Sequence, residues 1–152
     1  MSRRVLVIDD QFAKYEAIEA FFTEKFPEDS LTWIKNFRQA QSNLTKLRFD
    51  LVVLDMSFDV HAAESEDSSF NGLSGLHVLQ FMWRSKIYIP VIICTSHSKY
   101  SDPEFGVLDS IDALRSHVKL SFGDTVLGCV RMGSSEASWK RELEELVRNE
   151  RK

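Results

Sequence analysis

The sequence has few of the features that mark secreted, membrane or nucleic-acid-binding proteins. Only 2 of its 152 residues are cysteines, and both Cys94 and Cys129 lie in apolar runs, so we expect buried, reduced thiols. No apolar run approaches the length of a membrane span, and the four apolar residues after Arg4 are too few for a signal-peptide core. The formal net charge of −4 disfavours a general nucleic-acid or anionic-membrane surface. These absences predict a cytoplasmic protein that contacts neither membrane nor nucleic acid directly.

Length and composition are those of an ordinary globular chain. A length of 152 residues favours a single domain over 1–152 that can bury a core without disulfides. Hydrophobic residues make up 43% and charged residues 28%, and the chain shows neither repeats nor a long linker.

The hydrophobic pattern alternates between strands and helices. Short apolar runs predict five buried strands, at 5–8, 31–34, 51–54, 89–94 and 125–132. Apolar residues at helical spacing predict the helices 12–26, 37–48, 76–85, 110–122 and 137–149. In the long stretch 97–124, Asp102-Pro103 is typical of a helix start, and Ser110 is a candidate cap of the following helix. The acidic stretch 59–72 has no period and predicts a loop.

Such an alternation predicts a parallel sheet with helices on both faces and a functional crevice at the carboxyl ends of the strands. Asp9 and Asp10 follow the first strand, Asp55 follows the third, and Thr95 follows the fourth. If these strands are neighbours, three carboxylates and a hydroxyl converge at one edge. Such carboxylates need a cation, and an all-oxygen site suits Mg²⁺. A metal-held aspartate beside a hydroxyl can accept a phosphoryl group.

Simpler interpretations of the same residues remain open. The two adjacent aspartates could cap the following helix and favour its dipole. Asp55 could form a turn at a strand end, and Thr95 could be a local cap. The four histidines show no close ligand spacing, which disfavours a transition-metal site.

Four segments carry a resemblance to a known family: VLVIDD, FDLVVLDM, GLHVL and PVIICTS. In this order they resemble the receiver domain of bacterial two-component response regulators, over nearly the whole chain. The resemblance implies an α/β, flavodoxin-like (βα)5 fold, a doubly wound parallel sheet with strands in the order 2-1-3-4-5. The connections after the third and fourth strands would be enlarged.

The resemblance also implies roles for individual residues. Asp55 would be the phosphoacceptor, and Asp9 and Asp10 would hold Mg²⁺ together with Asp55. The backbone carbonyl of Ser57 would be a further metal ligand, and the hydroxyl of Thr95 would turn towards the phosphoryl group. The phosphoryl donor would be a histidine kinase or a phosphotransfer protein.

The chain departs from the receiver pattern at several positions. Receivers carry Met-Pro after the phosphoacceptor and then a glycine, whereas here Asp55 begins the sequence DMSFD and the matching glycine is Gly75. The family's lysine-proline pair, whose lysine binds the phosphoryl oxygens, is replaced in GCVRMGSS, where the lysine position falls on Arg131 or Met132. Arg131 is the candidate lysine substitute, provided that a one-residue shift such as a bulge turns it inward. The family's strand-five aromatic is also missing, with Gly128 or Cys129 in its region.

Three function classes follow. The first is a stand-alone, non-enzymatic signalling domain that accepts a phosphoryl group at Asp55 with Mg²⁺ and acts through a protein partner of unknown identity. Since no output domain fits in the remaining residues, the enlarged segments 59–74 and 97–124 are candidate partner sites, and a homodimer is left open. The second class is a phosphorylation-independent interaction module. The third, a Mg²⁺-dependent phosphohydrolase, is disfavoured because DMSFD lacks aspartates two residues apart.

Overall fold

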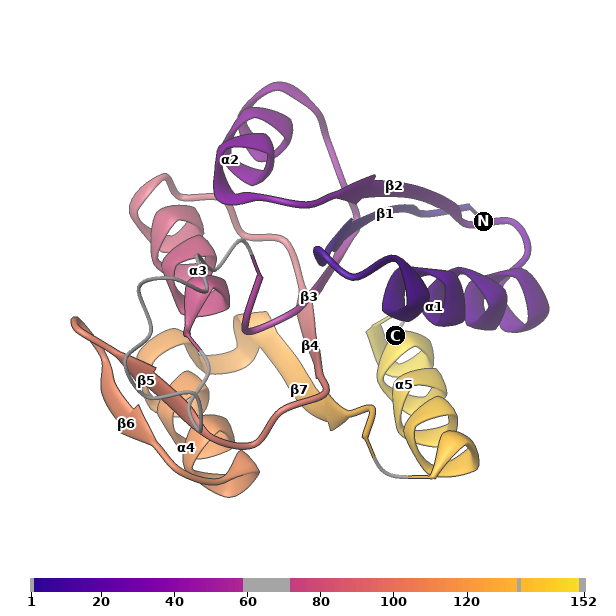
Figure 1. Ribbon diagram of the computed structural model, residues 1–152. Coiled ribbons are helices and arrows are strands. Elements are labelled where there is room, and N and C mark those ends of the chain that lie inside the picture. Colours follow the sequence, from indigo (N-terminus) through magenta and orange to yellow (C-terminus); the bar gives the residue numbers. More distant parts are fainter. Residues whose placement is uncertain (1, 59–71, 134, 151–152) are drawn as a thin grey trace.

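The computed structural model describes residues 2–58, 72–133 and 135–150. Its centre is a sheet of five strands, which is visible in Figure 1. The strands of this sheet are β1 (Arg4–Ile8), β2 (Ser30–Ile34), β3 (Leu51–Leu54), β4 (Val91–Thr95) and β7 (Val126–Arg131). All neighbouring strands are parallel, and their order is β2-β1-β3-β4-β7. Because β7 is the fifth strand of this sheet, the predicted flavodoxin-like order 2-1-3-4-5 is confirmed.

Helices cover both faces of the sheet (Figure 1). They are α1 (Phe12–Lys25), α2 (Phe37–Lys46), α3 (Ser74–Arg84), α4 (Ile111–Phe122) and α5 (Glu136–Glu150), with a short 3₁₀ turn, η2 (Gly123–Thr125), after α4. Alternate strand residues point to opposite faces, so Val5 and Val7 pack with α1 and α5 while Leu6 and Ile8 pack with α2, α3 and α4. The three central strands β1, β3 and β4 are therefore buried on both faces, which explains their unbroken apolar runs, whereas the edge strands β2 and β7 are only partly buried.

The segment after β4 differs from the prediction. The expected helix start at Asp102-Pro103 is wrong, because these residues belong to an antiparallel hairpin formed by β5 (Tyr100–Asp102) and β6 (Gly106–Leu108). The Asp102 carboxylate accepts hydrogen bonds from the backbone N–H groups of Glu104 and Phe105 and so closes a turn instead of starting a helix. Gly106 follows at φ 81°, a conformation that glycine adopts without steric cost.

Two contacts fix the hairpin and the helix after it. The second oxygen of Asp102 lies 2.9 Å from Nε2 of His77, which attaches the hairpin to α3. The Ser110 hydroxyl accepts a hydrogen bond from the Ala113 N–H, so the predicted N-cap is confirmed. Cys94 and Cys129 are buried free thiols, as predicted.

Arg3 links the beginning of β1 to the end of α5. Its guanidinium donates to the Val147 carbonyl at 3.0 Å and to the Glu150 carboxylate at 2.9 Å. The same guanidinium forms an ion pair with Asp29, which precedes β2. One side chain thus joins three segments that are distant in sequence.

The predicted loop at 59–72 lies almost entirely outside the described residues. Within the described part of the chain, no helix combines the length and the apolar character needed to cross a membrane.

Candidate functional site

Three carboxylates meet at the carboxyl edge of the sheet. Asp9 and Asp10 directly follow β1, and Asp55 directly follows β3, its neighbour in the sheet. Asp9 and Asp55 are buried and Asp10 is exposed, and one oxygen from each lies within 4.8 Å of the others. The structure therefore brings together the three aspartates that the sequence singles out.

A buried lysine lies among these carboxylates. The Lys14 ammonium is 2.7 Å from Oδ1 of Asp55 and 3.0 Å from Oδ2 of Asp9. Only 6% of the Lys14 side chain is exposed. Lys14 lies in the first turn of α1, on the buried stripe that continues through Ile18 and Phe22. The site therefore contains a fixed cation that the sequence analysis did not identify.

The ionisation of the cluster reflects its burial. Burial is the largest influence on Asp55 and raises its pKa to about 6, although the Lys14 ammonium acts in the opposite direction. Burial also raises the pKa of Asp9, again against the effect of Lys14. For Lys14, burial by itself would lower the pKa, but Asp55 and Asp9 together raise it above its ordinary value. Lys14 is therefore charged at neutral pH, and two carboxylates share its single positive charge.

The donor set fits a hard cation in addition to Lys14. All three side chains offer carboxylate oxygens, the ligand type that Mg²⁺ prefers. Oδ2 of Asp9 is buried and close to Lys14, yet it accepts no hydrogen bond from the described residues. Ser57 lies two residues beyond Asp55, and its hydroxyl donates to the Gly72 carbonyl. A metal-binding role for the Ser57 carbonyl stays a prediction.

Gly75 permits α3 to approach Asp55 closely. The Gly75 N–H donates to the Met56 carbonyl at 2.9 Å. A Cβ atom at this position would lie 2.6 Å from the Asp55 carbonyl oxygen and 3.0 Å from the Met56 Cα. A side chain here would therefore clash with the backbone. Glycine is thus required here by contact with the backbone of the candidate phosphoacceptor.

The Thr95 hydroxyl is engaged by the β5–β6 hairpin. Its Oγ1 lies 2.5 Å from the hydroxyl oxygen of Tyr100, which itself donates to the His97 carbonyl at 2.6 Å. Burial raises the pKa of Tyr100, so its hydroxyl keeps its one proton. That proton is donated to the His97 carbonyl. Thr95 must therefore donate its own proton to Tyr100.

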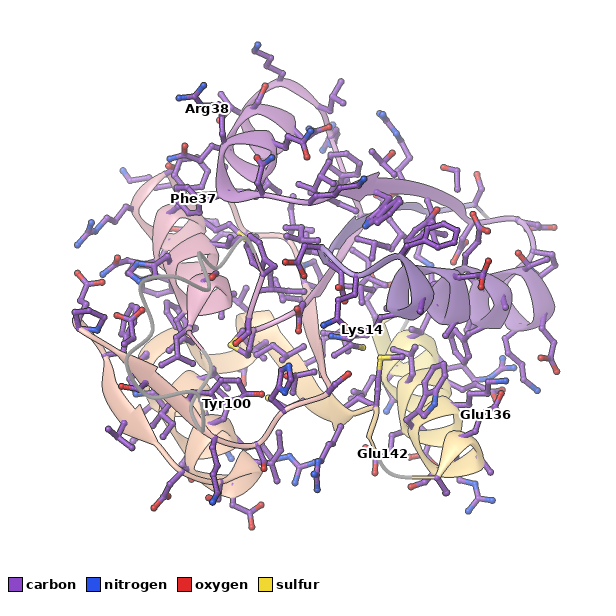
Figure 2. The ribbon with its side chains drawn as sticks, in the orientation of Figure 1. Lys14, Phe37, Arg38, Tyr100, Glu136 and Glu142 are labelled. Carbon is purple, nitrogen blue, oxygen red and sulfur yellow. The ribbon has the colours of Figure 1, made fainter. Side chains whose placement is uncertain are left out.

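In Figure 2, Lys14 lies near the centre of the view and Tyr100 on the hairpin side.

Arg131 and Met132 lie at the end of β7. The pairing of β4 with β7 shifts by one residue between Val126 and Gly128. The strand therefore contains a one-residue shift of the kind that the sequence analysis required for Arg131 to turn inward. Arg131 is nevertheless exposed, with its Cα beside that of Thr95, while Met132 is half-buried and donates its N–H to the Thr95 carbonyl. The ammonium that contacts Asp55 comes from Lys14, and the role of Arg131 stays a prediction.

Of two residues that were missed, Lys14 and Tyr100, a sequence signal could have found only Lys14. Lys14 occupies the position four residues before Ile18, so a lysine stands within an apolar stripe, where an ammonium requires a partner. Tyr100 comes five residues after Thr95, in a segment without a clear period. Only the fold shows that Tyr100 packs in the core and reaches back to β4.

The fold is that of response regulator receiver domains. The structure superposes on the signal receiver domain of a protein described as a Luxo repressor from Vibrio parahaemolyticus, with a TM-score of 0.68, 15% identity, and coverage of 99% of this chain and 94% of that chain. A CheY-like receiver domain from Methanospirillum hungatei superposes with a TM-score of 0.64 and 12% identity, over 99% of this chain and 98% of that chain. The receiver domain of RcsB from Salmonella enterica was solved with the phosphomimetic BeF3⁻. It superposes with a TM-score of 0.64 and 15% identity, over 97% of this chain and 90% of that chain.

At these identities the similarity establishes the fold alone. No known protein-family profile matches the sequence. No curated protein matches it either.

Proposed function

We propose that this protein is a receiver-like signalling domain that accepts a phosphoryl group on Asp55 and acts by binding a protein partner, without enzymatic turnover of its own. The observation that carries the proposal is the convergence of Asp9, Asp10 and Asp55 around the Lys14 ammonium at the carboxyl edge of the sheet. A histidine kinase or a phosphotransfer protein would supply the phosphoryl group.

In this proposal Asp55 acts as the nucleophile. With acetyl phosphate as donor, a carboxylate oxygen of Asp55 attacks phosphorus, a new O–P bond forms, and the O–P bond to acetate breaks. Acetate leaves with the electron pair as its anion, so charge is conserved and no proton is required. Mg²⁺ held by Asp9, Asp10, Asp55 and the Ser57 carbonyl would neutralise phosphoryl oxygens as negative charge gathers there.

Intact-mass measurement after treatment with acetyl phosphate and Mg²⁺ tests this proposal. We expect the wild type to gain the mass of one phosphoryl group and the gain to disappear in a chelator and in Asp55→Asn. Asp50→Asn is the matched control, because Asp50 is an exposed carboxylate at the opposite end of β3. A wild type that gains no phosphoryl mass and binds no beryllofluoride would refute phosphoacceptance. Steady turnover of a generic phosphate ester would instead favour a phosphohydrolase.

One set of contacts favours a phosphorylation-independent interaction module as the second candidate. The Thr95 hydroxyl proton is directed to Tyr100. The enlarged segment that holds Tyr100 also exposes apolar side chains, with Val107 61% and Leu120 88% exposed. Such side chains are suited to partner contact. In this case beryllofluoride with Mg²⁺ would leave amide exchange across residues 97–131 unchanged, and a partner would bind equally well to wild type and Asp55→Asn.

A further inference from the structure

We infer that Lys14, on α1, is the residue whose ammonium binds the phosphoryl oxygens on Asp55. This inference rests on the proposed function, since it assigns the cation for the reaction at that same site. It places the cation on the first helix instead of at the end of the fifth strand of the sheet.

Distance and burial carry the assignment. The Lys14 ammonium lies 2.7 Å from Oδ1 of Asp55, so a phosphoryl group on either oxygen of this carboxylate would be attached to a carboxyl group that Lys14 already contacts. A second contact, to Asp9 at 3.0 Å, also holds the ammonium. Because the side chain is buried, its position is fixed before any phosphoryl group arrives, and no flexible chain has to be ordered.

The charge balance favours a functional role over a purely structural one. A buried ammonium is costly to desolvate, and at this site the cost is offset only by the negative charges of Asp9 and Asp55. Phosphorylation replaces one negative charge of Asp55 with the two negative charges of the phosphoryl group, beside the same ammonium. The attraction to Lys14 therefore grows as the reaction proceeds, which is the property of a group that stabilises the phosphorylated state.

Arg131, the other candidate for binding the phosphoryl oxygens, is less well positioned than Lys14. Arg131 ends β7 as an exposed residue beside Thr95, whereas Lys14 is in direct contact with Asp55. The two residues lie on different elements, so single substitutions can separate their contributions.

The test compares Lys14→Met, Arg131→Met and the wild type. Lys25→Met serves as the matched control, because Lys25 lies on the same helix but is 37% exposed. Beryllofluoride affinity in the presence of Mg²⁺ is measured by calorimetry, phosphoryl uptake from acetyl phosphate by intact mass, and folding by circular dichroism. We expect Lys14→Met to lose about ten- to a hundredfold in beryllofluoride affinity, the value of one charge-assisted hydrogen bond. Lys25→Met should bind like the wild type.

A second measurement uses the unaltered side chain, in case Lys14→Met fails to fold. In wild-type protein with ¹⁵N-labelled lysine, the Lys14 ammonium resonance should shift when beryllofluoride and Mg²⁺ are added. It should not shift in Asp55→Asn under the same conditions. An unshifted resonance in a wild type that does bind beryllofluoride would overturn the inference.

The outcomes separate this inference from the proposed function. If the wild type binds beryllofluoride and folded Lys14→Met binds it equally well, or if only Arg131→Met loses affinity, the assignment to Lys14 is overturned and Asp55 remains the phosphoacceptor. If the wild type neither binds beryllofluoride nor gains phosphoryl mass, the proposed function is overturned, and the assignment to Lys14 is overturned with it.

Discussion

Removal of the Lys14 ammonium should destabilise the protein and make its stability depend on Mg²⁺. In Lys14→Met, the buried carboxylates of Asp9 and Asp55 lose the cation that they share at 3.0 and 2.7 Å. Removing one partner of a buried ion pair costs about 3–5 kcal/mol, and because the neighbouring Asp10 is exposed to water we expect the lower end, about 3 kcal/mol at pH 7.5. Urea unfolding in chelator measures this free energy, with Lys25→Met as the control.

Added Mg²⁺ should restore much of the lost stability. The variant leaves two carboxylates without a counter-charge, so it should bind the metal more tightly than the wild type does. A free concentration ten times the dissociation constant adds about 1.4 kcal/mol to the free energy of unfolding. The gain for the wild type should be smaller, since Lys14 already neutralises part of the charge.

The pH dependence has a definite sign. The folded-state pKa of Asp55 is raised from 3.8 to about 6, so protonation favours the folded state. The stability that Asp55 contributes is fully present below about pH 4 and is lost as the pH rises through about 6. Without Lys14, which lowers this pKa, the loss extends to higher pH. The deficit of Lys14→Met should therefore be larger at pH 8 than at pH 5. A variant as stable as the wild type at pH 8 in chelator would refute the reasoning.

Three further substitutions test other parts of the structure. Gly75→Ala should cost about 1–3 kcal/mol in urea unfolding, since its Cβ would lie 2.6 Å from the Asp55 carbonyl oxygen, and unchanged stability would contradict the close approach. Tyr100→Phe should cost about 1–2 kcal/mol and speed amide exchange in residues 97–108, because Thr95 and His97 each lose a hydrogen-bond partner; unchanged exchange would show that the hairpin is held by other contacts. Arg3→Met should cost about 3 kcal/mol by the same measurement, because it removes the guanidinium that pairs with Asp29 and Glu150 and donates to the Val147 carbonyl, and a loss below about 0.5 kcal/mol would show that the Arg3 contacts contribute little.

The sequence predicted the sheet well because its three central strands are buried on both faces and its two edge strands still carry short apolar runs. Each of the five apolar runs became a strand of the sheet, and the strand order followed from the resemblance to receiver domains. The convergence of Asp9, Asp10 and Asp55 was predictable because each directly follows one of two neighbouring strands. The geometry of parallel sheets therefore determined this part of the site.

The remaining features depend on tertiary contacts. The β5–β6 hairpin has strands of only three residues, too short for a periodic signal, and its turn is closed by Asp102 rather than by a distinctive dipeptide. For these carboxylates the sequence predicted Mg²⁺ as the counter-charge and not Lys14, because a lysine in a helix is usually solvated. Because Lys14 contacts Asp55, Asp55→Asn would remove a partner of a buried ammonium.

The Arg3 contacts also bear on how this chain folds during its synthesis. The hydrogen bond from Arg3 to the Val147 carbonyl joins residues 144 positions apart, so it cannot form until nearly all of the described chain has left the ribosome. Until then, α5 cannot cover its side of the sheet, and Val5, Val7 and Val53 lack the packing of Trp139 and Leu143. The nascent chain thus exposes an apolar surface that a ribosome-associated chaperone can bind, and docking of α5 is the step that ends this exposure.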